Sequence, residues 1–366
     1  MGSSVRLLLP FALLAVLACG APADNAAPPP DPDLGTDIVA GAAMDGSLFL
    51  LGEGSDRSRA GTLVSFRLSD GARTIQLRNV IAIHKAGEHL WAFAKTAQPQ
   101  LYRLMEWRNG AFAGVSTIAF GWRNTPLALT DIAGHPAVLG TRSVRRFDGA
   151  AWQNVGFDDD TSNPTWGYAS VGAPAAGRYL YIGFNRGEWG GGLKRVDLAS
   201  GKVEVIENHA HAAGSMSSVL ESDLDPVQAI IPDPARNDCV LIAIGLVHMM
   251  ASGRVDRVCG LEASIVFDPV KINQYPGGNL ADEQAFFGLI ATGNGYWAAS
   301  DEGVYHFGPP WEPGPVPEPE KFPFGKFEFW HGLWVTRGVP GAIVLVTEIN
   351  RHFSVNGGTP LIVPLD

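Results

Sequence analysis

The residues of this chain best suited to metal chemistry are histidines and methionines in two short segments. His209 and His211 are separated by one residue, and His248 is followed directly by Met249 and Met250. In an extended segment, side chains two residues apart point to the same side, so His209 and His211 could bind one ion together. Imidazole suits copper and zinc, and thioether sulfur favours copper(I). We therefore consider a copper or zinc site at these residues; the alternative is solvated histidines beside methionines that fill gaps in the packing.

Two other irregular segments carry polar side chains. The acidic run from Asp158 to Asp160 offers oxygen ligands for calcium, but it lacks the glycine and distal glutamate of an EF-hand loop, so a solvated acidic loop is the alternative. A second segment contains Arg186, Glu188 and Trp189. We expect both segments to lie on one ligand-binding face together with the histidine segments.

Linear catalytic motifs do not occur in the chain. It contains no G-x-S-x-G, H-E-x-x-H, C-x-x-C, Walker or G-x-G-x-x-G sequence. The catalytic residues of an enzyme therefore stay unassigned. A lyase or hydrolase that uses one of the three histidines, assisted by Glu188 or Arg186, is the alternative to a binding module.

Cys239 and Cys259 flank an expected hairpin. The segment 239–246 is apolar and strand-like, 253–260 is the return, and the bend falls at 248–250. A hairpin centred on Met249 places the two cysteines opposite each other, at about 4.5–5.5 Å between Cα atoms, which is within disulfide range. We predict a disulfide between them, with two buried free thiols as the alternative.

The N-terminus has the features of a targeting segment. Arg6 precedes a short apolar stretch, 7–18, which ends in the sequence Val-Leu-Ala followed by Cys19. This junction resembles the lipobox of bacterial lipoproteins, in which the cysteine is lipidated and becomes the new N-terminus. The resemblance implies a signal peptide at 1–18, a lipidated Cys19 at the start of a Pro/Ala-rich tether at 19–36, and, because no Asp follows Cys19, an outer-membrane location. Ordinary secretion with cleavage at the Ala-Pro-Ala of 21–23 is the alternative.

The remainder, 37–366, contains a repeated phrase of glycine or a turn residue followed by apolar and aromatic residues. The phrase begins at Gly46, Gly87, Gly134, Gly177, Asn237, Gly295 and Gly332. The steps are 41, 47, 43, 60, 58 and 37 residues, and periods near 40–50 residues of short strands indicate a β-propeller. We predict an all-β, seven-bladed β-propeller in which each phrase opens the first strand of a blade.

Two segments resemble the sensor-type propeller repeats of bacterial two-component regulators. They are 143–152 (SVRRFDGAAW) and 300–307 (SDEGVYHF), each preceded by a strand ending in a small residue. In those repeats a strand of the form leu-trp-x-gly-thr precedes one of the form gly-leu-tyr-arg-tyr-asp-gly. The resemblance implies the fold and does not assign an activity. We also expect the strand at 37–40 to complete the last blade and close the ring.

Composition agrees with this interpretation. Hydrophobic residues make up 46% and charged residues 17% of the chain, with 44 glycines and 26 prolines, as many short strands and tight turns require. A net charge of −10 without a basic run excludes a nucleic-acid partner. The sequence favours a membrane-anchored binding module for a protein or polysaccharide of the cell envelope, and it does not specify an oligomeric state.

Overall fold

The computed structural model is built from short antiparallel β-strands. It describes residues 38–52, 60–159, 169–172, 177–185, 187, 191–211, 218–221, 224–248, 250–269, 284–292, 295–300, 303–309, 320–323, 333–339, 342–347 and 361–364. The predicted signal peptide, Cys19 and the tether lie outside the described residues. No helix within the described ranges is long and apolar enough to cross a membrane.

The first sheet joins two four-stranded units through one long strand. Its strands, in spatial order, are β1 (Ile38–Met44), β2 (Ser47–Gly52), β3 (Gly61–Arg67), β4 (Arg73–Ala86), β5 (His89–Lys95), β6 (Leu101–Arg108) and β7 (Ala111–Ala119). The first half of β4 pairs with β3 and its second half with β5, and Val80 pairs with both. Asn79, with a φ of 59°, allows the strand to bend at this point.

The remaining sheets follow one another along the chain. The second contains β8 (Pro126–Ile132), β9 (His135–Gly140), β10 (Ser143–Phe147) and β11 (Trp152–Gly156). The third contains β12 (Ala169–Gly172), β13 (Tyr179–Phe184), β14 (Leu193–Asp197) and β15 (Val203–Ile206). A two-stranded hairpin, β16 (Asn208–His211) and β17 (Ser218–Leu220), comes next.

Three sheets complete the chain. One contains β18 (Val227–Pro232), β19 (Cys239–His248), β20 (Met250–Cys259) and β21 (Glu262–Phe267). Another contains β22 (Phe286–Thr292), β23 (Gly295–Ser300), β24 (Gly303–Phe307) and β25 (Glu320–Pro323). The last contains β26 (Leu333–Val339), β27 (Ala342–Thr347) and β28 (Leu361–Pro364).

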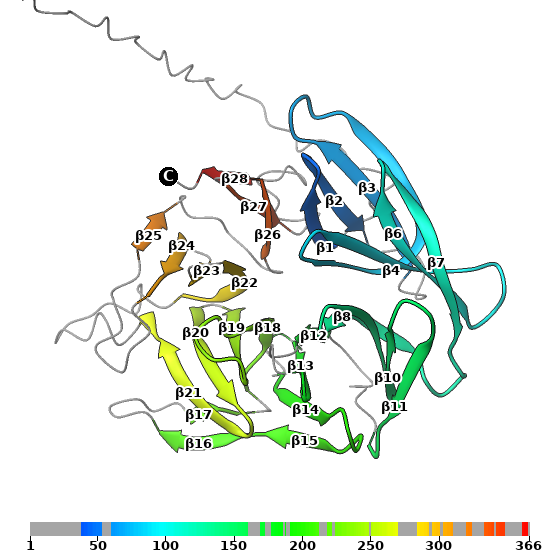
Figure 1. The fold of residues 1–366 in the computed structure, drawn as a ribbon. Helices are drawn as coiled ribbons and strands as arrows, with labels where there is room; N and C mark the ends of the chain where they lie inside the picture. The colour runs from blue at the N-terminus through cyan, green and yellow to red at the C-terminus, as the bar shows by residue number, and fades with distance from the viewer. Residues whose placement is uncertain are drawn as a thin grey trace, which may run out of the picture.

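The sheets surround a common centre as the blades of a β-propeller do (Figure 1). Neighbouring sheets are in contact through their innermost strands, in the successive pairs β1–β4, β4–β8, β8–β12, β12–β18, β18–β22, β22–β26 and β26–β1. Hydrophobic clusters lie between neighbouring sheets and, in the first sheet, between its two four-stranded units. One of them combines side chains of β8–β10 with those of β13 and β14. The all-β prediction and the β-propeller prediction are confirmed.

The repeated phrase marks a different strand from the one expected. Gly46, Gly87, Gly134 and Gly177 have φ values of 55–77° and lie in the turns before β2, β5, β9 and β13, which are second strands. The expectation that the phrase opens the first strand is therefore wrong by one strand. In the last sheet the phrase falls on β26 instead, which is the innermost strand there.

The role expected for the N-terminal strand also needs correction. β1 pairs with β2 through partners such as Ala42 and Phe49, and it forms the first strand of its own sheet. It contacts β26 of the last sheet without being added to that sheet. The expectation that residues 37–40 complete the last blade is wrong, because the short turn at Asp45 and Gly46 directs β1 back along β2.

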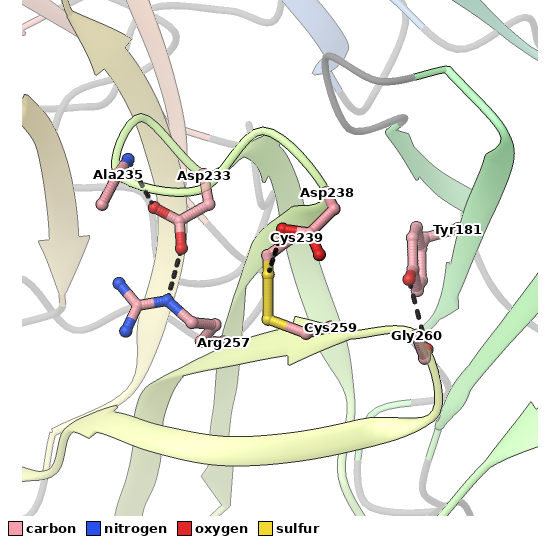
Figure 2. The surroundings of a disulfide bond; sticks show 8 residues. All are labelled: Tyr181, Asp233, Ala235, Asp238, Cys239, Arg257, Cys259 and Gly260. Carbon is pink, nitrogen blue, oxygen red and sulfur yellow. Dashed lines mark hydrogen bonds and ion pairs between the residues drawn. A yellow bond between two sulfur atoms is a disulfide. The ribbon is translucent and has the colours of Figure 1, made fainter.

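The predicted disulfide is present. Cys239 and Cys259 are register partners on β19 and β20, with Cα atoms 4.4 Å apart, and their sulfur atoms are bonded. The hairpin closes at His248 and Met250, so its centre is at Met249 as predicted. Figure 2 shows the surroundings of this bond. Tyr181, on β13 of the neighbouring sheet, donates a hydrogen bond from its hydroxyl to the Gly260 carbonyl, with 3.2 Å between the two oxygen atoms.

Candidate functional site

The links that contain the irregular segments singled out from the sequence begin and end at strands whose ends lie on one side of the sheets. In an antiparallel blade, the link between the second and third strands and the link to the next blade's first strand emerge at the same end. We call this end the linker face. Residues 158–168 follow β11, 186–190 lie between β13 and β14, 207–217 follow β15, and 249 lies between β19 and β20. The bounds of the flanking strands therefore place the links that contain these segments at the linker face, although most residues of the segments lie outside the described ranges. The shared ligand-binding face stays a prediction.

The predicted metal ligands are only partly within the described residues. His209 and His211 belong to β16, where His211 is the register partner of Ser218, and His248 is the partner of Met250. Met249 lies outside the described residues. No group of three or more His, Cys, Asp or Glu side chains that could hold a metal ion occurs in the described ranges. The copper or zinc site stays a prediction.

The predicted ligand-binding residues divide in the same way. Asp160, Arg186, Glu188 and Trp189 lie outside the described residues. The Asp158 carboxylate accepts a hydrogen bond from the Val203 backbone N–H at 2.8 Å, so it ties the end of one sheet to the outer strand of the next. This contact gives Asp158 a structural role on the linker face.

The linker face displays an exposed tryptophan that the sequence did not single out. Trp122 has 73% of its surface exposed, whereas Trp91, Trp107 and Trp297 are at most 9% exposed and pack within the core. It lies in the link between β7 and β8. The backbone N–H of Asn124 donates to the Gly121 carbonyl at 2.9 Å, which closes a four-residue turn with Trp122 and Arg123 at its two central positions. The turn is called the Trp122 turn below.

A set of hydrogen bonds fixes the Trp122 turn to the link between β9 and β10. The Asn124 side chain donates to the Ser143 hydroxyl at 2.7 Å and accepts from the Arg142 backbone N–H at 3.0 Å. The Thr141 hydroxyl donates to the Arg123 carbonyl at 3.2 Å. The turn is therefore held by a second element of the fold and does not depend on its own closing bond alone.

Close packing beneath the turn restricts its position further. A Cβ atom added at Gly140 would lie 2.3 Å from Asn124 Oδ1 and 2.9 Å from a ring carbon of Phe120. The Arg145 guanidinium covers the Phe120 ring, with Cζ 4.5 Å from the centroid, and donates to the Ala119 carbonyl. The base of the turn is thus well packed, while its tip is exposed.

The tip carries a cation beside the indole. Arg123 Cζ lies 4.3 Å from the ring centroid of Trp122, a cation–π contact. Within the described part of the chain the Arg123 guanidinium has no carboxylate or carbonyl partner. The turn therefore offers an aromatic surface together with N–H donors that could bind an anionic group, which is the chemistry of a recognition site.

A second link on this face also exposes a large apolar side chain. Leu224 has 64% of its surface exposed and precedes β18. Its backbone N–H and that of Asp225 donate to the Glu221 carbonyl, at 3.2 and 2.9 Å, while the Glu221 N–H donates to Asp225 Oδ2 at 2.8 Å. We call Glu221, Leu224 and Asp225 together the Leu224 turn; residues 222 and 223 lie outside the described ranges.

A buried arginine anchors the Leu224 turn to the sheet of β18–β21. Arg254 Nη2 donates to Asp225 Oδ2 at 2.7 Å and to the Val219 carbonyl at 2.8 Å, and its Nε donates to Asp256 Oδ2 at 3.1 Å. The backbone N–H of Gly192 donates to the Asp225 carbonyl at 2.8 Å. Strands of two neighbouring sheets thus meet at this turn.

Asp256 is the least solvated carboxylate of this network. Its side chain is 0% exposed, and Oδ1 has no hydrogen-bond partner within the described residues. Burial raises the pKa of Asp256 to about 7, against the opposing effect of the Arg254 charge. The network therefore contains a carboxyl group that gains or loses a proton near neutral pH.

A histidine–carboxylate pair lies at the opposite end of the sheets. His84 Nε2 is 3.1 Å from Asp131 Oδ1, and the pair joins the inner strands β4 and β8. The hydrogen bond from His84 lowers the pKa of the Asp131 carboxyl, an effect that outweighs its partial burial. The pair stabilises the contact between two sheets.

Comparison with solved structures agrees with the fold. The extracellular domain of a putative one component system from B. thetaiotaomicron is similar with a TM-score of 0.50 and 12% identity, over 89% of this chain and 38% of that chain. Hydrazine synthase of Kuenenia stuttgartiensis is similar with a TM-score of 0.53 and 10% identity, over 94% of this chain and 99% of that chain. This chain thus spans well under half of the sensor protein's domain. No family model and no curated protein sequence matches the chain.

Proposed function

We propose that this chain is a lipid-anchored binding module of the bacterial cell envelope, which holds a protein or surface polymer on the linker face. The observation that carries the proposal is the Trp122 turn. A tryptophan left 73% exposed adds nothing to the hydrophobic core, yet its turn is fixed by hydrogen bonds from a second link. Tryptophan and arginine are the residues most enriched where binding energy concentrates, and rigid presentation reduces the entropy lost on binding.

The proposal includes a seven-bladed ring as the scaffold. Support comes from the innermost strands, which contact each other in succession and include the contact of β26 with β1. A closed ring leaves its links at fixed positions around the centre, and such links on a rigid scaffold are common binding sites.

The proposal also places the chain at the outer membrane through lipidated Cys19. Its support is the apolar segment 7–18 that ends directly before Cys19, and the proline-rich tether that follows. A Cys19→Ser substitution should move the chain from the membrane pellet to the soluble periplasmic fraction. If the substituted chain stays in the pellet, lipidation does not anchor it.

Binding is tested with the full chain carrying Cys19→Ser and with envelope fragments from cells that lack the protein. We expect the chain to co-sediment with the fragments and Trp122→Ala to weaken this association by tenfold or more, since aromatic anchors typically contribute about 2 kcal/mol or more. Leu261→Ala is the matched control, because Leu261 is 44% exposed but lies between β20 and β21 at the opposite end. Equal association of the Trp122→Ala variant would contradict the proposal.

A further inference from the structure

The Trp122 turn and the Leu224 turn occupy equivalent places in the fold. Trp122 stands four residues before the first residue of β8, and Leu224 stands three residues before the first residue of β18. Both strands are innermost strands, so both turns lie next to the centre of the linker face. Among the exposed large hydrophobic side chains of the described residues, these two have the highest exposed fractions.

The two turns are also fixed in the same way. In both turns, the carbonyl of the residue directly before the inner strand accepts a backbone hydrogen bond. The Thr125 carbonyl accepts from the Thr141 N–H, in the link after β9, at 3.0 Å. The Pro226 carbonyl accepts from the Gly245 N–H, on β19, at 3.3 Å. A glycine makes room for each turn. Gly140 does so for the first, and a Cβ atom at Gly191 would lie 2.6 Å from Pro226 Cα at the second. Each turn thus presents an apolar side chain from a rigid base.

We propose that Trp122 and Leu224 are two anchors of one docking surface for a folded protein, whose apolar pockets receive them and whose carboxylate pairs with Arg123. This inference rests on the proposed binding function and names its class of partner. β12 lies between β8 and β18, so the anchors are two sheet spacings apart, roughly 20 Å or less. That separation fits within a standard interface of about 800 Å² on each side.

The leucine is the feature that selects a protein over a polysaccharide. A leucine side chain has neither a π face nor a polar group, so a hydrated sugar gains little from contact with it. Transfer of a leucine side chain from water into an apolar pocket of a protein is favourable, because it removes apolar surface from water. Arg123 selects the charge of the partner, because its guanidinium lies beside Trp122 and no carboxylate of the described residues pairs with it. An arginine at an interface is stabilised best by a carboxylate that accepts two hydrogen bonds.

The test is site-specific photo-crosslinking of the full chain in its own cells. The crosslinking amino acid p-benzoylphenylalanine replaces residue 122, 224 or, as the control, 261, and mass spectrometry identifies each adduct. We expect positions 122 and 224 to give adducts with one and the same protein, distinct from this chain, and position 261 to give none. Arg123→Glu should reduce both adducts tenfold or more, whereas Arg123→Lys should retain them in part.

Each other outcome overturns the inference. Adducts with a polysaccharide or with a second copy of this chain would retain the binding function but exclude a heterologous protein partner. Different proteins at the two positions would mean two separate sites. If neither position gives an adduct while envelope fragments still retain the chain, the docking surface is wrong and the binding function stands. If retention is also absent, both fail.

Discussion

Arg123 Cζ lies 4.3 Å from the ring centroid of Trp122, and both side chains stand on the two central positions of one closed turn. At an exposed site such a contact contributes about 0.5–1 kcal/mol. Its larger effect is on order, because each side chain restricts the rotamers of the other before any partner arrives. Preordered side chains lose less entropy on binding. The turn is therefore ordered in the free protein, as the proposed binding function requires.

The first prediction concerns which side chains of the Trp122 turn stabilise the fold. Trp122→Ala should lower the free energy of unfolding by no more than about 0.5–1 kcal/mol, the contribution of the contact with Arg123, because the ring is otherwise mostly exposed. Asn124→Ala should lower it by about 1–3 kcal/mol, because it removes two hydrogen bonds between links. Urea denaturation of both variants measures this, and equal losses would show that Trp122 contributes to the fold.

The second prediction concerns the space beneath the turn. Gly140→Ala should destabilise the protein by about 1–3 kcal/mol, because the new methyl group meets the hydrogen-bonded Asn124 oxygen and the Phe120 ring. Gly121→Ala is the matched control, since a Cβ atom there has no neighbour within 4 Å. Thermal unfolding of the two variants should differ by several degrees. A Gly140→Ala variant as stable as the control would mean that the turn is not tightly packed.

The chain's periodicity was sufficient to predict the all-β class and the propeller, because glycine in a left-handed turn recurs before the second strands β2, β5, β9 and β13. Gly46, Gly87 and Gly134 are each required by a positive φ in a hairpin. The position of the phrase within the blade could not be read in this way. The glycine phrase does not distinguish innermost strands, because β8 lacks it whereas β26 follows it, so only contacts with neighbouring sheets show which strands are innermost.

The sequence predicted the disulfide but not the exposed Trp122 turn. Cys239 and Cys259 are symmetric about one hairpin, so local register alone brings them together. Trp122 is exposed because Asn124 is bound by the link after β9, a contact between segments about 20 residues apart. The sequence does contain a local signal, since glycine and asparagine at 121 and 124 favour a turn with tryptophan inside it.

The third prediction concerns the disulfide. In the Cys19→Ser background, Cys239→Ala with Cys259→Ala should lower the free energy of unfolding by about 3 kcal/mol, because the bond closes a loop with a sequence separation of 20 in the unfolded chain. Urea denaturation of this variant and its parent measures the difference. Titration of the unreduced parent should find no free thiol. Two reactive thiols in the parent, or a loss below 1 kcal/mol, would contradict the prediction.

The last prediction follows from the buried carboxyl group of Asp256. Its pKa is about 7 in the folded protein and near 3.8 when unfolded, so between these values the folded state binds more protons. The contribution of Asp256 to stability is therefore fully present below about pH 4 and declines as the pH rises toward 7. Each unit of upward pKa shift corresponds to about 1.4 kcal/mol.

Asp256→Asn replaces the protonated carboxyl with a neutral group of similar shape, while Asp225 still pairs with Arg254. We expect the variant to match the parent near pH 4.5 and to become progressively more stable than the parent toward pH 8. Urea denaturation at half-unit pH intervals measures the difference between the two proteins, which removes the contribution of all other titrating groups. A difference that is constant with pH, or one that favours the parent at pH 8, would show that Asp256 stays ionised beside Arg254. In that case Asp256 and Arg254 would form an ion pair throughout the tested pH range.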